Sequence, residues 1–283
     1  MENWFVDALL VTLSIGIVAF VNKIFAKRKY DQRFAAIILY GIMFILAIGY
    51  GLSFGVVGVE LVPFLSIVLF GVLVYFYSII MMTALRYLPT SVYFVNVRLI
   101  SSFILLFIGI VFFGDSVSID RWIGFFVGVM AMVLLLEKDS SMKNVNYRKG
   151  IWILILGAVV LVFSHVLYKS FASITDIIPT FLLITFLSAF LSAIIFGHKQ
   201  IKINKQYFKE IFVINLGLAV LYFYYFVMLF KVYAVGSLGI SYKIQSYSPF
   251  VPIVLAAIVY KEKISFKKKI ALVLVAISLW FFM

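Results

Sequence analysis

The sequence predicts an all-α integral membrane protein with ten transmembrane helices, arranged as two inverted five-helix repeats. Three observations lead to this prediction: an apolar composition, an alternation of charge between successive connections, and a recurrence of residues about 147 positions apart. Of the 283 residues, 65% are hydrophobic and 12% are charged. A water-soluble chain of this length could not bury that much apolar surface.

Ten apolar stretches follow one another, each long enough to cross a hydrocarbon core of about 30 Å. Since every backbone polar group must be satisfied within lipid, we expect these spans to be helices. The predicted spans are residues 4–26, 34–54, 61–85, 91–113, 121–137, 150–171, 178–197, 208–232, 237–260 and 268–283. No basic segment precedes the first span and no small-residue cleavage site follows it, so we expect a retained helix rather than a signal peptide.

The charges outside the spans predict the orientation of the chain. The connections after the first, third, fifth, seventh and ninth spans carry net charges of +3, +1, +2, +3 and +4, whereas the opposite side holds six acidic residues and one arginine. Positive residues mark the cytoplasmic face, so we expect both termini outside the cytoplasmic (plasma) membrane. The net charge of +13 is therefore read as a topology signal that also suits anionic lipid, and no nucleic-acid partner is expected.

Several residues of the second half of the sequence match residues of the first half at a nearly constant shift. At a shift of 147, Tyr222–Tyr224 falls on Tyr75–Tyr77. The same shift pairs Ser248 with Ser101 and Glu262 with Asp115, and a shift of 146 pairs Lys169 with Lys23. Matched polar residues in the same order carry more weight than matched apolar ones in so apolar a chain, so we expect one structural unit to occur twice.

The two units are predicted to be residues 1–147 and 148–283, related by inversion. Each unit holds five spans, and because five is an odd number the second unit enters the membrane from the opposite side. Most equivalent connections accordingly carry opposite charge: the one after the first span is +3, and its counterpart after the sixth span holds only Asp176. Inverted-topology repeats of this kind are typical of secondary transporters.

Two segments carry a family resemblance, "ALRYLPTSVYFVNVRLISSFILLFIGIVFFGDSVS" from residue 84 and "YKIQSYSPFVPIVLAAIVYKEKIS" from residue 242. With their ten spans, they resemble the drug/metabolite transporter superfamily, and most closely its EamA-type ten-helix members. The matching features are Ala-Leu-x-Tyr at residues 84–87, Pro249 in the fourth helix of its unit, and an acid after it, Glu262 or the weaker Asp115. The resemblance implies a transporter fold and no particular substrate. EamA-type members commonly have cytoplasmic termini, and the charges here indicate the opposite.

Bases within the spans are the first candidates for a binding site. Arg98 and Lys243 lie about 6 Å and 8 Å from the middle of their spans at 1.5 Å per residue, and no carboxylate lies deep in any span. Intramembrane ionisable residues are functional candidates by default. We therefore expect both to face a central cavity and bind an anion; the alternative is a cation held by carbonyls or tyrosine faces in a packed core. Lys23, Lys169 and Lys231 lie near span ends, where they can snorkel.

Polar residues around these bases extend the predicted site. In the ninth span we expect Gln245 and Ser248 to bind substrate, and in the fourth span Asn96. Pro249 and Pro252 free the carbonyls of Gln245 and Ser248 from helical bonding, which predicts a hinge there. A bend that serves packing alone is the alternative.

Tyrosines and one histidine complete the set. Tyr75 and Ser78 share a helix face, as do Tyr222 and Tyr225, and these four are expected to line the cavity while the other tyrosines of the repeated triplets pack. His165 is a candidate for proton coupling, because its side chain titrates near neutrality; a satisfied interior histidine is the alternative.

These features predict a secondary transporter that moves a small organic solute by alternating access. Bases without acidic partners suggest an anionic or zwitterionic solute, such as an amino acid, an organic acid or a phosphorylated metabolite. A flippase for a lipid-linked phosphate is the first alternative, and a non-transporting receptor or an intramembrane enzyme belongs to another class. No Walker, His-Glu-x-x-His or Gly-x-Ser-x-Gly sequence is present, so we expect no enzyme, no direct use of ATP, and no metal or cofactor. The expected partners are the bilayer and the solute, with oligomeric state undetermined.

Overall fold

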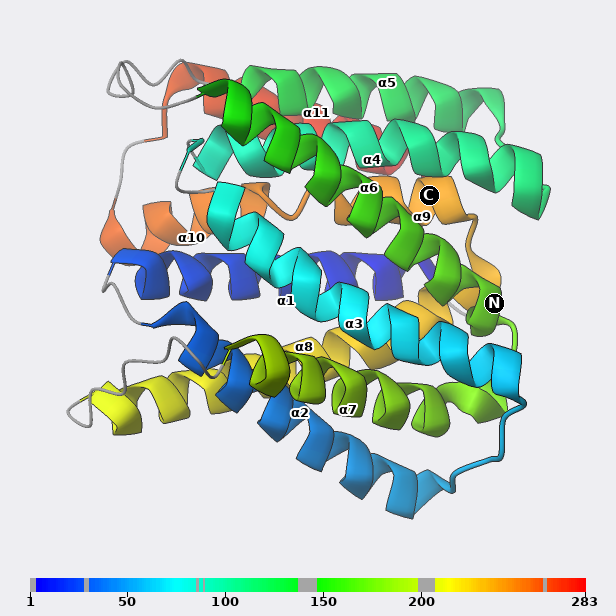
Figure 1. Cartoon of the computed structure of the whole chain (residues 1–283). Coiled ribbons are helices and arrows are strands. Elements are labelled where there is room, and N and C mark those ends of the chain that lie inside the picture. The colour runs from blue at the N-terminus through cyan, green and yellow to red at the C-terminus, as the bar shows by residue number, and fades with distance from the viewer. Residues whose placement is uncertain are drawn as a thin grey trace.

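The computed structural model describes residues 4–27, 31–84, 87–88, 90–136, 147–197, 207–261 and 264–283, and all regular structure within these ranges is helical (Figure 1). The helices are α1 (Trp4–Lys27), α2 (Gln32–Phe54), α3 (Leu61–Ala84), α4 (Thr90–Phe113), α5 (Ile119–Leu134), α6 (Tyr147–Ala172), α7 (Ile178–Gly197), α8 (Phe208–Val235), α9 (Leu238–Gln245), α10 (Phe250–Tyr260) and α11 (Phe266–Trp280). A short 3-10 helix, η1 (Thr175–Ile177), precedes α7.

Seven of these helices, α1 to α4 and α6 to α8, are long and apolar enough to cross a membrane. Large apolar side chains also face outward, and Ile45, Phe107 and Phe112 are 66%, 63% and 76% exposed. Such an apolar exterior suits lipid and is unfavourable in water. The predicted class, an all-α membrane protein, is therefore confirmed.

The helices lie side by side in a bundle (Figure 1). Helices α4, α5 and α11 lie along one edge, and α2, α7 and α8 lie along the other. In the packing of the bundle, α2 contacts α7, α1 contacts α8, α3 contacts both α6 and α7, and α5 contacts α11. Helix α1 begins and α11 ends at the same end of the bundle, and α1 and α6 run in opposite directions.

The predicted ninth span, residues 237–260, is broken into α9 and α10. The break falls where the prolines predict it, with Pro249 at the N-cap of α10 and Pro252 in its first turn. The carbonyls of Gln245 and Ser248, however, are not free. They accept hydrogen bonds from Ser248 N at 3.0 Å and Val251 N at 3.2 Å, because the chain tightens into turns of three residues between the two helices. The prolines therefore remove the regular helical bonds of these carbonyls, as predicted, and tight turns satisfy both carbonyls instead.

The contact between α3 and α7 depends on a small residue. A Cβ atom added at Gly71 would collide with the carbonyl oxygen of Thr185 and would lie 2.8 Å from Ser188 Cβ. Small residues let membrane helices approach this closely. Gly71 therefore sets the distance between the two helices.

Replacing Gly71 with alanine is expected to destabilise the protein by about 1–3 kcal/mol, because the added methyl group forces the two helices apart. Gly217→Ala is the matched control, since a Cβ at Gly217 meets no atom within 4 Å and alanine favours the helix. Thermal unfolding of the purified variants in detergent measures both. Equal melting temperatures for the two variants would contradict the packing described here.

Two charged side chains hold the turn between α8 and α9. Lys169 Nζ donates to the carbonyl oxygens of Tyr233 and Gly236 at 2.6 and 3.0 Å, at the C-terminal end of α8. The carboxylate of Asp115 accepts from Leu238 N at 2.6 Å, at the start of α9. A cation at a helix C-terminus and an anion at an N-terminus are both favourable. Lys169 therefore caps the C-terminal end of α8. From the sequence we had expected its side chain to snorkel toward the membrane surface.

Asp115→Ala is expected to lower stability by about 1 kcal/mol, the usual cost of a lost N-terminal cap. Asp115→Asn keeps an oxygen that can accept from Leu238 N, so its loss should be smaller. Melting temperatures in detergent test this, with Ser116→Ala at the exposed neighbouring position as the control. A melting temperature of Asp115→Ala equal to that of the wild type would show that the contact does not stabilise the turn.

Candidate functional site

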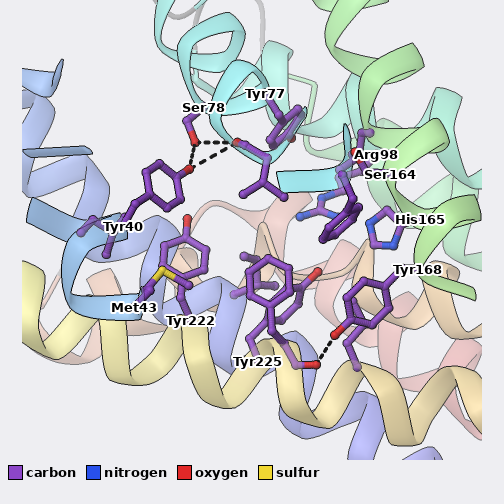
Figure 2. A pocket seen from close by; sticks show the side chains of 17 residues that line it. Tyr40, Met43, Tyr77, Ser78, Arg98, Ser164, His165, Tyr168, Tyr222 and Tyr225 are labelled. Atoms are coloured by element: carbon purple, nitrogen blue, oxygen red, sulfur yellow. Dashed lines mark hydrogen bonds between the residues drawn. The ribbon is translucent and has the colours of Figure 1, made fainter. Parts of the chain in front are cut away.

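The described residues line a partly open cavity of about 100 Å³ near the middle of the bundle (Figure 2). Six helices contribute to its wall: α1, α2, α3, α4, α6 and α8. Its lining consists of Ile15, Leu39, Tyr40, Met43, Phe70, Val74, Tyr77, Ser78, Arg98, Leu161, Ser164, His165, Tyr168, Tyr222, Tyr225, Phe226 and Leu229. Because the wall is built by several helices, the cavity exists only in the assembled bundle.

The cavity is aromatic and carries one arginine. Five tyrosines and two phenylalanines belong to the lining, and among the described lining residues there is no carboxylate. Tyrosine offers an apolar ring together with a hydroxyl group. The wall can thus hold the apolar body of a small molecule, and its one charged group would attract a negative one.

Arg98 lies in α4 and is 7% exposed. Its Nη1 donates to Tyr242 Oη at 3.3 Å, and its guanidinium carbon lies 5.6 Å from the centroid of the same ring. A guanidinium carries five N–H groups in a planar fork that fits a carboxylate. Tyr242 therefore fixes the orientation of Arg98 and leaves N–H groups for a ligand.

A chain of hydrogen bonds runs behind the wall from Tyr225 to His165. Tyr225 Oη donates to Gln245 Oε1 at 3.5 Å, and Gln245 Nε2 donates to Tyr233 Oη at 3.3 Å. Tyr233 Oη lies 2.7 Å from His165 Nδ1. The chain begins and ends at two lining residues, while Gln245 and Tyr233 stand outside the lining. It couples α6, α8 and α9.

The opposite side of the cavity is held by Tyr40 and Ser78. Their hydroxyl oxygens lie 2.6 Å apart, and Tyr40 Oη also reaches Val74 O at 3.3 Å, as the dashed lines in Figure 2 show. Tyr168 donates to the carbonyl oxygen of Phe226. These bonds fix two tyrosine rings against the space between α2, α3, α6 and α8.

Five of the predicted site residues come together in the lining: Arg98, Ser78, Tyr222, Tyr225 and His165. They come from four helices, α3, α4, α6 and α8, and were chosen for their depth in a span and their helical spacing. Whether they bind substrate stays a prediction.

The prediction that Tyr75 lines the cavity is wrong. It is buried outside the lining, where it meets Tyr40, Phe76 and Phe196 at ring-centroid distances of 6.4, 5.5 and 6.4 Å. Tyr77, expected to pack, lines the cavity instead. The lining residues of α3 are Phe70, Val74, Tyr77 and Ser78, so its cavity face is centred near Val74. Around the helix Tyr77 lies about 60° from Val74, whereas Tyr75 lies about 100° from it on the other side.

The prediction that Lys243 faces the cavity is also wrong, because this residue lies outside the cavity lining. Its side chain is 0% exposed, and its Nζ lies 3.8 Å from Met132 Sδ. The same atom lies 4.8 Å from the ring centroid of Phe125 and 5.5 Å from that of Tyr247. The side chain therefore projects from α9 toward α5, and cation–π contacts hold it there. This is the packed-core alternative that the sequence left open.

The remaining predicted residues also lie outside the lining. Gln245 lies behind the lining, where it forms hydrogen bonds with Tyr225 and Tyr233. Asn96 Nδ2 donates to Val92 O at 2.7 Å within its own helix. Ser248 is buried in the turn after α9, next to Pro249. Pro252 lies in α10, and neither proline of the predicted hinge belongs to the lining.

Several other lining residues were not predicted from the sequence, among them Tyr40, Met43, Ser164 and Tyr168. In α6 a signal was present, because the lining residues Leu161, Ser164, His165 and Tyr168 follow the spacing of one helix face. Tyr40 and Met43 sit three residues apart in an apolar span, where nothing in the sequence separates a cavity face from a packing face.

Comparisons with known proteins bear on the fold. No family model matches the sequence, and no curated protein matches it. Several solved structures are similar in fold, among them a crystal structure with a TM-score of 0.72 at 18% identity, whose alignment covers 97% of each chain. A likeness at this identity establishes a shared fold over nearly the whole chain and says nothing of the solute.

Proposed function

We propose that this protein is a secondary transporter of the drug/metabolite transporter type, which moves a small organic solute across the cytoplasmic membrane by alternating access. The observation that carries the proposal is the cavity, where tyrosine rings surround Arg98 between helices of both predicted units. Polar and charged side chains at membrane depth are costly and mark solute pathways. Transporters of this architecture bind solute between their repeats.

The packing of the helices supports ten spans in two inverted units, residues 1–147 and 148–283, with α9 and α10 together as the ninth span. If α1 to α5 correspond to α6, α7, α8, α9–α10 and α11, each major contact has a counterpart. The contact of α1 with α8 corresponds to that of α6 with α3, and α2 with α8 corresponds to α7 with α3. The contacts of α2 with α7 and of α5 with α11 each correspond to themselves. A two-fold axis in the membrane plane would produce this pattern.

The solute is proposed to be anionic or zwitterionic. Arg98 is the cation of the described lining, and no carboxylate in that lining balances it. The cavity of about 100 Å³ suits a small solute better than a lipid with two acyl chains. A thermal-shift screen with organic acids, amino acids and phosphorylated metabolites tests the class. The proposal expects the anions and zwitterions to stabilise the protein, and stabilisation by quaternary ammonium compounds alone would overturn it.

The proposed orientation, with both termini outside, can be tested directly because the chain contains no cysteine. Ser116 and Lys267 are both exposed. The proposed orientation places the connection that holds Ser116 outside the cell and the connection that holds Lys267 in the cytoplasm. Ser116→Cys is expected to react with a membrane-impermeant maleimide in intact cells, and Lys267→Cys only after permeabilisation. The reverse labelling pattern would contradict the orientation and would agree with the cytoplasmic termini common in EamA-type members.

A further inference from the structure

We infer that His165 is held as the neutral tautomer with its proton on Nε2, and that this N–H joins Arg98 in binding one carboxylate group of the solute. The inference rests on the proposed function and narrows it. It assigns His165 the role of a hydrogen-bond donor in place of a proton-coupling group, and it favours a solute with a single negative charge.

The first step is the polarity of the hydrogen-bond chain. Tyr225 donates to the oxygen of the Gln245 amide, so the nitrogen of that amide is the end that faces Tyr233. An amide nitrogen can only donate, so the phenol oxygen of Tyr233 accepts from it. The hydroxyl proton of Tyr233 is then free to point the other way, to the nitrogen 2.7 Å from its oxygen, His165 Nδ1.

The second step fixes the tautomer. A ring nitrogen that accepts a hydrogen bond carries no proton, so His165 Nδ1 is bare and the proton of the neutral ring sits on Nε2. An imidazolium would add a second positive charge beside Arg98, whose charge acts on His165, in a lining without a carboxylate. In a medium of low dielectric constant that repulsion is costly. Both arguments favour the neutral ring.

The third step places the donor. Nδ1 points to Tyr233, which lies behind the wall, and Nε2, one ring carbon away, points in a different direction from a ring that lines the cavity. The ring of His165 meets that of Tyr242 at 4.7 Å, edge to face, and the guanidinium of Arg98 lies over the same ring at 5.6 Å. Figure 2 shows Arg98, Ser164 and His165 on the same side of the cavity. Tyr242 thus contacts both side chains, Arg98 from α4 and His165 from α6, and both of them line the same cavity.

The chemistry that this pair recognises is a monocarboxylate. A carboxylate offers two oxygens that accept several hydrogen bonds, and a guanidinium together with a neutral N–H satisfies it with one net positive charge. A phosphate dianion would leave a negative charge unbalanced in a buried site. The tyrosine and phenylalanine rings are then left to hold the apolar part of the solute.

The tautomer can be observed by NMR, because the chain has only two histidines, His165 and His198. In a His198→Gln variant labelled with 15N-histidine, every histidine signal comes from His165. The inference expects one bare nitrogen, Nδ1, and one protonated nitrogen, Nε2, at neutral pH. Tyr233→Phe removes the hydroxyl that holds the tautomer, so its spectrum should show a mixture of the two forms. Protons on both nitrogens, or on Nδ1 alone, would overturn the inference.

Binding tests the role of the donor. The probe is benzoate, with benzamide and phenyl phosphate as its uncharged and dianionic counterparts, measured by calorimetry on the purified protein. The side-chain nitrogen of glutamine reaches the position of Nε2, and that of asparagine only the position of Nδ1. His165→Asn is therefore expected to weaken benzoate binding about tenfold or more, the effect of one hydrogen bond to a charged group. His165→Gln should weaken it clearly less, and His198→Gln should leave it unchanged.

The outcomes separate this inference from the proposed function. Equal benzoate affinity in wild type and His165→Asn, or phenyl phosphate bound more tightly than benzoate, would overturn the inference and leave an anion transporter in place. If the wild type binds none of the organic acids, amino acids or phosphorylated metabolites, the proposed solute class fails as well. Should the His165 variants fold poorly, the 15N spectrum of the His198→Gln protein still decides the tautomer.

Discussion

Replacing Arg98 with alanine is expected to weaken the binding of an anionic solute by about 30-fold or more. Truncating one partner of a buried, hydrogen-bonded charge pair costs about 2–5 kcal/mol, and each 1.4 kcal/mol is a tenfold change in affinity. Arg98 is nearly buried, and the lining offers no second cation among its described residues. Its loss therefore removes the charge that the solute neutralises.

Arg98→Lys separates charge from geometry. It keeps the positive charge but loses the planar fork, so we expect an affinity between those of the wild type and Arg98→Ala. The affinities are measured by calorimetry with the strongest anion of the thermal-shift screen. Arg121→Ala, an arginine outside the lining, serves as the control and should bind like the wild type. An Arg98→Ala protein with wild-type affinity would place the binding site elsewhere.

Lys243→Met is expected to raise the free energy of unfolding by about 1–4 kcal/mol, the range found when a buried ion pair is replaced by apolar side chains of similar volume. The ammonium group of Lys243 is fully buried among Met132, Phe125 and Tyr247, and burying a charge costs free energy. Methionine fills the same space without that cost. Since Lys243 lies outside the lining, solute binding should persist.

This expectation opposes the one drawn from the sequence, in which Lys243 binds the anion. Melting temperature and solute affinity are measured on the same Lys243→Met sample. The exposed Lys231 provides the control, because Lys231→Met removes a lysine that is not buried and should change stability little. A Lys243→Met protein that has lost solute binding while remaining folded would restore Lys243 to the site and contradict its placement here.

The membrane fold could be predicted from the sequence because it depends on long apolar runs. A span of about 20 apolar residues leaves the backbone no alternative to a helix in lipid. The broken ninth span was predicted as well, since Pro249 and Pro252 remove backbone donors. The closure of the freed carbonyls by tight turns was not, because it depends on the local path of the chain.

The site was predicted only in part, because depth in a span does not tell which way a side chain points. Arg98 and Lys243 lie at similar depth in their predicted spans, yet Arg98 lines the cavity and Lys243 projects toward α5. The direction is set by which neighbours each helix packs against, and that is a property of the whole bundle. The choice of Tyr75 over Tyr77 failed for the same reason, since spacing defines the faces of a helix but not which of them is turned inward.

The most direct test of the central claim is counterflow in proteoliposomes. Vesicles loaded with the unlabelled solute that gave the largest thermal shift are diluted into the same solute at trace concentration with a radioactive label. A transporter that alternates around one site exchanges the two, so the label should accumulate transiently in wild-type vesicles and not in Arg98→Ala vesicles. Label that stays at the level of empty liposomes with the wild-type protein, for every solute that binds, would contradict transport.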